Sequence, residues 1–265
     1  MNLQPHPLDV LPPDQIARLA EEVGVRKAKA GTVATVTLGI LAGAFIAFGA
    51  MFYTIAVTGS ELGFGPTRLL GGAAFSLGLV LVILGGAELF TGNSLIVIAW
   101  ASRRISSSEL LRNWCLVYFG NLVGAVATAA MVHWSGIMTL GDGSVGTTAA
   151  SIAAGKLALD PGEAFIRGVL CNVLVCLAVW MSLAAHSVSG KVLAIVFPVT
   201  AFVALGFEHS IANMYLLPIG MLQAGAIDPV SLAQSLAIVT AGNVVGGGIL
   251  VALVYWLVYI RQARR

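Results

Sequence analysis

Two short polar segments interrupt long apolar stretches of the chain, and they hold the residues whose types could do chemistry. Glu88-Leu-Phe-Thr-Gly-Asn93 and Glu208-His-Ser-Ile-Ala-Asn213 share the pattern E-x4-N. His209 is the one histidine in either segment, and Thr91 is its approximate counterpart. A histidine at such a break can donate a hydrogen bond to an anion or lend it a proton. The other interpretation of His209 is a hydrogen-bonded core residue.

The carboxylates and amides of these segments have a structural interpretation. A bare charge in the middle of an apolar span costs several kcal/mol, so Glu88 and Glu208 need partners. We expect them to accept hydrogen bonds from the loop backbone that each break exposes, with Asn93 and Asn213 helping to fix the same loops. A direct contact with a solute is the alternative for the two glutamates.

A second repeated motif lies downstream of each polar segment. Gly120-Asn121-x-x-Gly124 matches Gly242-Asn243-x-x-Gly246, at nearly the same offset as the first motif. We expect Asn121 and Asn243 to bond across to the two loops. Two motifs repeated in the same order indicate an internal duplication.

The elements that must position these residues are transmembrane helices. Of 265 residues, 58% are hydrophobic and only 10% are charged, whereas a soluble domain carries about 25% charged residues. A helix needs roughly 20 apolar residues to cross the hydrocarbon core. When the apolar stretches are joined across the two polar segments, the sequence predicts six spans: 32–58, 68–102, 110–135, 164–187, 191–222 and 232–260.

The order of these spans predicts an inverted repeat. Each half has a simple span, a broken span and a span with G-N-x-x-G, and because three is odd the second half enters the membrane upside down. The predicted fold is an all-α integral membrane protein with a channel domain over 31–260. Its inverted repeats cover about 31–135 and 164–260, and its second and fifth helices are broken. Such interrupted repeats are typical of transport proteins, whose sites lie near the bilayer midplane.

Loop charges predict the orientation. The side that would hold both termini has eleven basic residues, and the opposite side has Arg68, Lys156 and Arg167. By the positive-inside rule both termini are cytoplasmic.

Two terminal segments flank the predicted channel domain. Residues 261–265 form a short cytoplasmic tail. In residues 1–30, Pro12-Pro13-Asp14 predicts the start of an amphipathic cytoplasmic helix with Ile16, Leu19, Ala20 and Val23 on its apolar face and Glu21 and Glu22 facing elsewhere. This helix rests on the membrane or the bundle, or it plugs a pore.

Bulky apolar residues surround the polar segments and are candidates for packing or for a gate: Phe75, Leu79, Leu89, Phe90, Phe202 and Phe207. Apolar rings on either side of a polar site exclude hydrated ions and favour small, weakly hydrated solutes. The sequence has no metal-ligand spacing, no phosphate loop and no catalytic triad, so an enzyme has little support. We expect no cofactor and no nucleic-acid partner.

Four blocks of the sequence resemble the signature blocks of the formate/nitrite transporter family. They begin at Gly86 (GAELFT), Tyr118 (YFGNLVG), Asn172 (NVLVCLAVWM) and Gly206 (GFEHSIANM), and the resemblance extends over nearly the whole chain from about residue 10. Leu11-Pro-Pro and Gly246-Gly-Gly248 favour the bacterial formate-channel branch of the family.

The resemblance implies an aquaporin-like fold, a homopentamer with one pore in each protomer, and a place in the cytoplasmic (inner) membrane. The transported solute would be a small monovalent anion, formate or nitrite. The family's functional residues fall on the central His209 with Thr91 and Asn172 nearby, on the vestibule Lys156, and on apolar constrictions at Phe75, Phe202, Leu79, Leu89, Phe90 and Val175. The resemblance also implicates the N-terminal helix in gating.

Several alternatives stay open at this point. Gly92-Asn93 departs from the serine that commonly follows the threonine in formate channels, so nitrite or, more weakly, hydrosulfide competes with formate. Conduction is channel-like or coupled to a proton. A neutral-solute channel fits the repeat, but the chain has no Asn-Pro-Ala triplet. A membrane anchor subunit of a redox enzyme would need a second histidine at a matching depth to hold haem.

Overall fold

The computed structural model describes residues 10–262, and this part of the chain contains helices and no strand. Residues 1–9 and 263–265, the first part of the predicted N-terminal segment and most of the predicted tail, lie outside the described residues. Five segments are long and apolar enough to cross a membrane: α2 (Thr32–Val57), α3 (Phe64–Gly85), α5 (Ser107–Trp134), α7 (Pro161–Ala184) and the segment Pro229–Arg261. The last comprises α10 (Pro229–Val244) and two π-helical stretches, η3 (Val245–Leu253) and η4 (Trp256–Arg261). The predicted all-α membrane fold is confirmed.

Both polar segments lie where a helix stops. After α3 the chain is irregular until η1 (Gly92–Ile96) and α4 (Val97–Ala101), and after α8 (Val188–Ala204) it is irregular until α9 (Ser210–Ala224). Gly86 and Gly206 adopt left-handed backbone angles, with φ of 75° and 73°. Glycine takes this conformation at helix ends without steric cost. Helices α3 and α8, which precede the two polar segments, therefore end in the same way.

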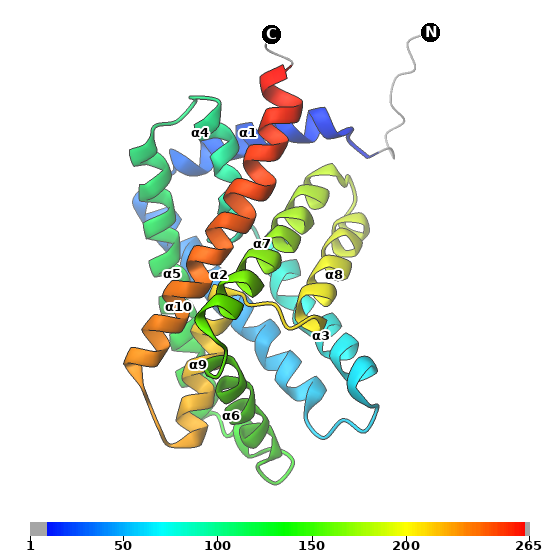
Figure 1. The fold of residues 1–265 in the computed structure, drawn as a ribbon, viewed down its shortest axis with the longest axis vertical. Helices are drawn as coiled ribbons and strands as arrows, with labels where there is room; N and C mark the ends of the chain where they lie inside the picture. The colour runs from blue at the N-terminus through cyan, green and yellow to red at the C-terminus, as the bar shows by residue number, and fades with distance from the viewer. Residues whose placement is uncertain (1–9, 263–265) are drawn as a thin grey trace.

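The N-terminal helix, α1 (Pro13–Ala28), starts at the predicted prolines and crosses one end of the bundle (Figure 1). Its inward face includes Ile16, Ala17, Ala20 and Gly24, and it packs on η1 and α4. Glu21 is buried on the same face and lies 3.7 Å from Arg104. The prediction that Glu21 faces outward is wrong, because the small residues around it let the helix pack closely on that side.

A helix that the sequence did not predict lies between the two halves. α6 (Ser144–Leu157) is only 14 residues long and packs against α9. Its small residues and threonines give neither a long apolar run nor a clear apolar face. Helices α1 and α6 precede α2 and α7 respectively, so each half has a leading helix (Figure 1).

Close helix packing explains the repeated glycines. A side chain at Gly124 would overlap the carbonyl oxygen of Ile40 on α2, and one at Gly246 would overlap the carbonyl oxygen of Val169 on α7. Helix α5 can therefore approach α2 closely, as the chain at Gly246 approaches α7.

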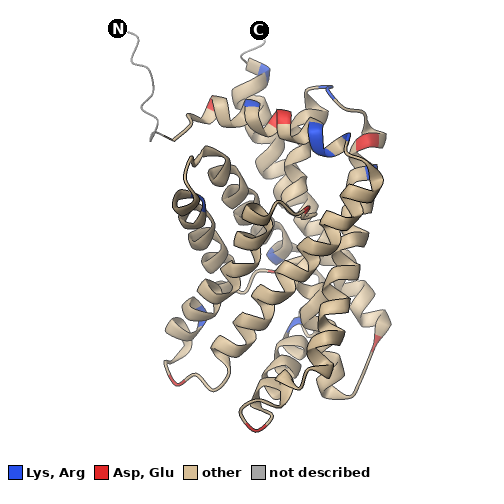
Figure 2. Cartoon of the chain, turned by 180° about the vertical axis from the view of Figure 1, so that it is seen from behind, with Lys and Arg blue, Asp and Glu red and all other residues tan. Residues whose placement is uncertain are grey.

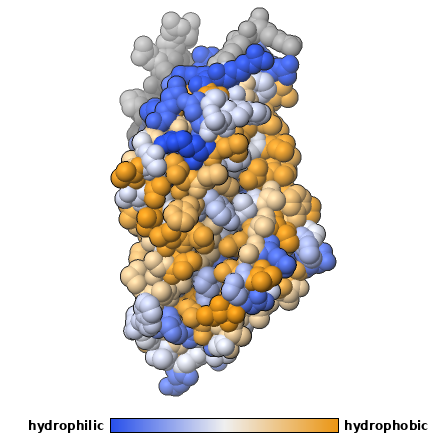
Figure 3. All heavy atoms as spheres, turned by 90° about the vertical axis from the view of Figure 1, so that its left-hand side faces the viewer, coloured by the Kyte–Doolittle hydropathy of each residue, from blue (hydrophilic) through white to orange (hydrophobic). Residues whose placement is uncertain are grey.

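The surface has the character of a membrane protein. An apolar belt surrounds the middle of the molecule on the face seen in Figure 3, with polar residues above and below it. In Figure 2 charged residues gather at the end that carries α1, and acidic residues lie at loop tips at the other end.

Candidate functional site

Two buried asparagines fix the two irregular loops in the same way. The Asn121 side-chain amide donates to the carbonyl oxygens of Gly39 and Glu88, both at 2.8 Å, and its Oδ1 accepts from the Phe90 N–H at 2.9 Å. The Asn243 amide donates to the carbonyls of Gly168 and Glu208, at 2.8 and 2.9 Å, and its Oδ1 accepts from the Ser210 N–H at 2.9 Å. Each asparagine thus satisfies two buried backbone groups of its break and ties the loop to a carbonyl in the middle of the first long helix of its half, α2 or α7.

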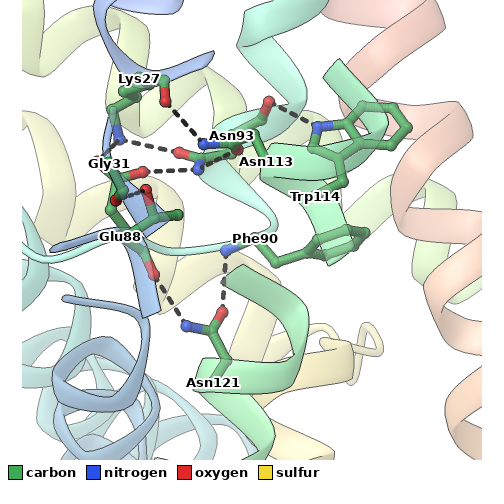
Figure 4. A network of polar contacts seen from close by, with 9 residues as sticks. Lys27, Gly31, Glu88, Phe90, Asn93, Asn113, Trp114 and Asn121 are labelled. Carbon is green, nitrogen blue, oxygen red and sulfur yellow. Dashed lines mark hydrogen bonds and ion pairs between the residues drawn. The ribbon is translucent and has the colours of Figure 1, made fainter. Parts of the chain in front are cut away.

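The carboxylate of the first loop belongs to a closed polar cluster (Figure 4). Glu88 lies 3.1 Å from Lys27 Nζ of α1 and accepts from the Asn93 amide at 2.7 Å. Asn93 Oδ1 accepts from Lys27 Nζ at 2.9 Å, and the Asn93 amide also donates to Asn113 Oδ1. The Trp114 indole completes the cluster by donating to the Asn93 carbonyl.

The carboxylate of the second loop has the same two types of partner. Lys156 Nζ of α6 donates to both carboxylate oxygens of Glu208, at 2.9 and 3.0 Å, and the Asn213 amide donates to one of them at 2.7 Å. Asn213 Oδ1 is buried without a hydrogen-bond partner. Lysine, glutamate and asparagine therefore recur in both clusters.

The expectation for the two glutamates named the wrong partners. Neither carboxylate accepts from the loop backbone, which Asn121 and Asn243 already satisfy. Each carboxylate instead faces a lysine of the leading helix of its half. A buried charge requires an opposite charge and hydrogen bonds, and a lysine supplies both.

Thr91 and His209 meet where the two loops approach each other. His209 Nε2 lies 3.0 Å from Thr91 Oγ1, and both residues are buried. The ring of Phe202 stacks on the imidazole, with centroids 5.8 Å apart, and the ring of Phe75 meets Phe202 edge-on at 5.6 Å. The central polar pair is therefore enclosed by aromatic residues on one side.

The second imidazole nitrogen of His209 determines its tautomer. Nδ1 accepts a hydrogen bond from the Ala212 N–H at 3.0 Å and so caps the N-terminus of α9. An acceptor nitrogen carries no proton, so the neutral ring has its proton on Nε2 and donates to Thr91. The Thr91 hydroxyl proton then remains available for another acceptor.

Asn172 holds the backbone next to Thr91. Its amide lies 3.3 Å from the Thr91 carbonyl, 3.1 Å from Ser94 Oγ and 2.6 Å from the Asn243 carbonyl. Cys176 Sγ, one turn further along α7, also lies 3.4 Å from the Thr91 carbonyl. Because these protein acceptors occupy the amide, Asn172 positions Thr91.

Two cavities lie on opposite sides of the central pair. The α1-side cavity, about 230 Å³, is lined by Lys27, Glu88, Asn93 and Lys191 among apolar residues. The α6-side cavity, about 310 Å³, is lined by Lys156, Glu208 and His209 together with Arg68 and Arg167.

The predicted constriction residues differ in which of the two cavities they line. Leu79 and Leu89 line the α1-side cavity, and Phe75, Phe202 and Phe207 line the α6-side cavity. Phe75 and Leu79 are one turn apart on α3, so the two cavities approach each other at this turn. Val175 is buried and lines neither cavity. Phe90 also lines neither, and its ring packs on Trp114 and Tyr118 at 5.9 and 5.0 Å.

Sequence reasoning missed Lys27, Asn113 and Trp114. Lys27 and Lys156 are 129 residues apart, the same offset as Gly39 and Gly168, whose carbonyls bind the two pinning asparagines. This offset differs from the 120 and 122 residues that separate the two repeated motifs. A search of the sequence at 129 residues would have paired the two lysines. Asn113 and Trp114 have no matching residue types in the second half, where Ser235 and Leu236 stand at the corresponding offset.

A bundle of apolar helices whose two breaks enclose a buried polar pair between two cavities is typical of membrane transport proteins. Comparison with known proteins shows to which family of transport proteins the chain belongs. The sequence profile described as "Formate/nitrite transporter" matches residues 14–257, and the chain belongs to the formate/nitrite transporter family. The resemblance inferred from the four sequence blocks is confirmed.

Individual relatives cover almost the whole chain. "Formate channel FocA" of Escherichia coli (strain K12) is 41% identical in an alignment of 277 positions that covers 97% of this chain and 97% of its own. "Formate channel FocA" of Haemophilus influenzae is 37% identical over 92% of this chain and 93% of its own. A solved structure titled "Pentameric formate channel with formate bound" has a TM-score of 0.80 at 40% identity, covering 87% of this chain and 98% of that one. These relatives are channels, and the prediction that the chain is not an enzyme is confirmed.

Proposed function

We propose that the protein conducts formate across the cytoplasmic (inner) membrane, as a homopentamer with one pore in each protomer. The observation that carries this proposal is the buried Thr91–His209 pair between the two cavities, with a separation of 3.0 Å. The relatives named as formate channels support the choice of solute, and the pentameric neighbour supports the assembly. Both termini would be cytoplasmic, as the loop charges predict.

In this proposal His209 acts as a neutral hydrogen-bond donor. Its Nδ1 is occupied by the Ala212 N–H, so a second ring proton could bind only if this cap were broken. Nε2–H and the Thr91 hydroxyl together offer two donors to a carboxylate, which accepts through two oxygens. Donation by His209 of a full proton is the alternative mechanism.

The aromatic and aliphatic residues next to the pair would set the selectivity. Phe75 and Phe202 on one side and Leu79 and Leu89 on the other provide no polar group to replace the water around a strongly hydrated ion. A small monovalent anion loses less hydration energy than a multivalent anion does, and it receives two hydrogen bonds at the centre. This combination favours formate, nitrite or hydrosulfide over multivalent anions.

The test is a comparison of solutes in proteoliposomes that contain the purified protein. Fluxes of formate, nitrite, hydrosulfide and glycerol are measured at equal gradients, with protein-free vesicles as control. The proposal predicts the largest flux for formate and no glycerol flux above the control. Equal glycerol and formate fluxes would indicate a neutral-solute channel, and nitrite flux well above formate would reassign the substrate within the family.

A further inference from the structure

The charges that line the α6-side cavity are unevenly compensated. Three cations, Arg68, Lys156 and Arg167, face one lining carboxylate, Glu208. Lys156 binds both oxygens of Glu208, and the two side chains are only 17% and 5% exposed. Lys156 is therefore neutralised by a close, largely buried partner, and its charge contributes little to the field at the cavity entrance.

The other two cations differ in their partners. Arg167 lies 3.5 Å from Glu163, which is 59% exposed. Arg68 has no carboxylate within ion-pair distance among residues 10–262; its guanidinium donates to the carbonyls of Ala204 at 2.9 Å and Val203 at 3.1 Å and lies over the Phe64 ring. Arg68 thus supplies a full positive charge that no acidic side chain cancels.

The two guanidinium groups converge at one point of the cavity wall. A methyl group added at Gly206 would lie 2.9 Å from Arg68 Nη2 and 3.8 Å from Arg167 Nη1. Like charges this close repel each other, and an anion between them or in front of them relieves the repulsion. A guanidinium has five N–H donors, and the two carbonyl contacts of Arg68 leave others for a ligand.

We propose that Arg68, with Arg167 beside it, forms a capture site for a small monovalent carboxylate or similar anion at the α6-side entrance of the pore. The Lys156–Glu208 pair then fixes the loop before His209, while Arg68 attracts the anion. The two backbone contacts of Arg68 hold the guanidinium at the end of α8, and Phe202, Phe207 and His209 line the same cavity. The captured anion is therefore placed in the cavity that leads to His209. This inference rests on the proposed formate flux.

The experiment uses oriented proteoliposomes. Vesicles with an accessible C-terminal tag are captured, so the α6 side faces the lumen and efflux of formate enters the protein through the α6-side cavity. Initial efflux is measured at about 10 mM and about 500 mM ionic strength, since salt screens long-range attraction. Arg68→Gln removes the charge, Arg68→Lys keeps it, and Arg26→Gln removes an exposed cation of α1 that lines neither cavity.

The expected result is a loss of efflux of about fivefold in Arg68→Gln at low ionic strength that falls below twofold at high ionic strength. Arg68→Lys should stay within twofold of the parent protein at both ionic strengths, and Arg26→Gln should leave efflux from the lumen unchanged at low ionic strength. Equal losses in Arg68→Gln and Arg68→Lys at both ionic strengths would overturn the proposal, because they would show that Arg68 only caps α8. Parent-like efflux in Arg68→Gln would also overturn it. Absence of formate flux in the parent protein would instead contradict the proposed function.

A chemical variant covers the case in which Arg68→Gln does not fold. Arg68→Cys, in a Cys115→Ser background that removes the exposed native thiol, is modified after purification with a cationic or a neutral methanethiosulfonate reagent. The proposal predicts that only the cationic adduct restores low-salt efflux. Equal efflux with both adducts would contradict it.

Discussion

The two breaks are built on the same plan but are completed differently. In both, an asparagine of α5 or α10 satisfies two backbone groups of the loop and binds a carbonyl of α2 or α7. A lysine of the leading helix faces the glutamate. In the first break Asn113 and Trp114 close the cluster around Asn93. In the second break Asn213 Oδ1 has no partner. The shared part holds each loop at membrane depth, and the difference determines what each loop presents at the centre.

The difference at the centre follows from the residues after each glutamate. Phe90 and Ser210 occupy equivalent positions, because the N–H of each donates to its pinning asparagine. Phe90 turns its ring onto Trp114 and Tyr118, and its neighbour Thr91 meets His209. The symmetric frame therefore supports an asymmetric pair of a hydroxyl and an imidazole, which together can bind one anion.

The largest effect on stability is expected from substitution of the two loop-fixing asparagines, Asn121 and Asn243. Asn121→Leu and Asn243→Leu each leave one loop carbonyl and one loop N–H buried without a partner, at a cost of about 2–6 kcal/mol in total. Both variants should lose folded pentamer in detergent, as seen by size-exclusion chromatography and thermal unfolding. Val123→Ala, at a half-exposed position of α5, is the control and should behave as the parent. Loss of the pentamer in one variant only would show that the two pins are not equivalent.

A smaller and unequal effect is expected from the two lysines. Lys156→Met leaves Glu208, 5% exposed, without its cation and should destabilise the protein by about 3–5 kcal/mol. Lys27→Met should cost about 1–2 kcal/mol, because Lys27 and Glu88 are 28% and 13% exposed and water screens the lost charge. Thermal unfolding of the two variants side by side gives the order. If Lys27→Met were the less stable variant, the α1-side cluster would be the more dependent on its cation.

The double variants sharpen this comparison. Lys156→Met with Glu208→Gln should recover most of the stability lost in Lys156→Met, because no uncompensated charge remains buried. Lys27→Met with Glu88→Gln should recover less, since less is lost in the single variant. A double variant at the α6 side that is no more stable than Lys156→Met would show that hydrogen bonding, and not charge, dominates there.

The smallest effect on stability is expected from the N-cap residues of α5 and α10. Ser106 caps α5 in a capping box with Glu109, and Asp228 caps α10 through the N–H groups of Val230 and Ser231. Ser106→Ala and Asp228→Ala should each lower Tm by only a few degrees. Hydrogen bonds from the Ser231 side chain and backbone hold the pKa of Asp228 below its ordinary value. The cap therefore stabilises the fold above the ordinary carboxyl pKa and weakens as the pH falls through the lowered pKa, so the Tm difference between parent and Asp228→Ala should shrink in acid.

Much of this arrangement could be predicted from the sequence, because it depends on apolar length and on repeated motifs. The breaks were located by Glu88 and Glu208, and the pinning asparagines by their repeated glycine neighbours. The leading helices were not matched, because the offset between halves is 129 residues at these helices and within the first long helix but 120 at the breaks. The choice of lysine over backbone as the partner of each carboxylate depends on how α1 and α6 pack, which no local pattern encodes.

Side-chain directions at the loops were also beyond the sequence. Phe90 has the residue type of a pore constriction, but Trp114 and Tyr118 offer its ring an aromatic site away from both cavities. The interpretation of Asn172 as a neighbour of the anion came from resemblance. Its amide is occupied by three protein acceptors, and this count depends on the approach of Asn243 and Ser94 from distant parts of the chain.

The most direct test of the central pair is formate flux through His209→Gln and His209→Leu between pH 5 and pH 8. Glutamine can offer an N–H near the position of Nε2 but cannot donate a proton as an acid, whereas leucine fills the space without a donor. The account predicts that His209→Gln keeps at least about a tenth of the parent flux with the parent's pH dependence, and that His209→Leu falls to the level of protein-free vesicles. Equal loss in both variants, or a flux in His209→Gln that no longer changes with pH, would contradict the role of His209 as a neutral donor and favour proton transfer through its ring.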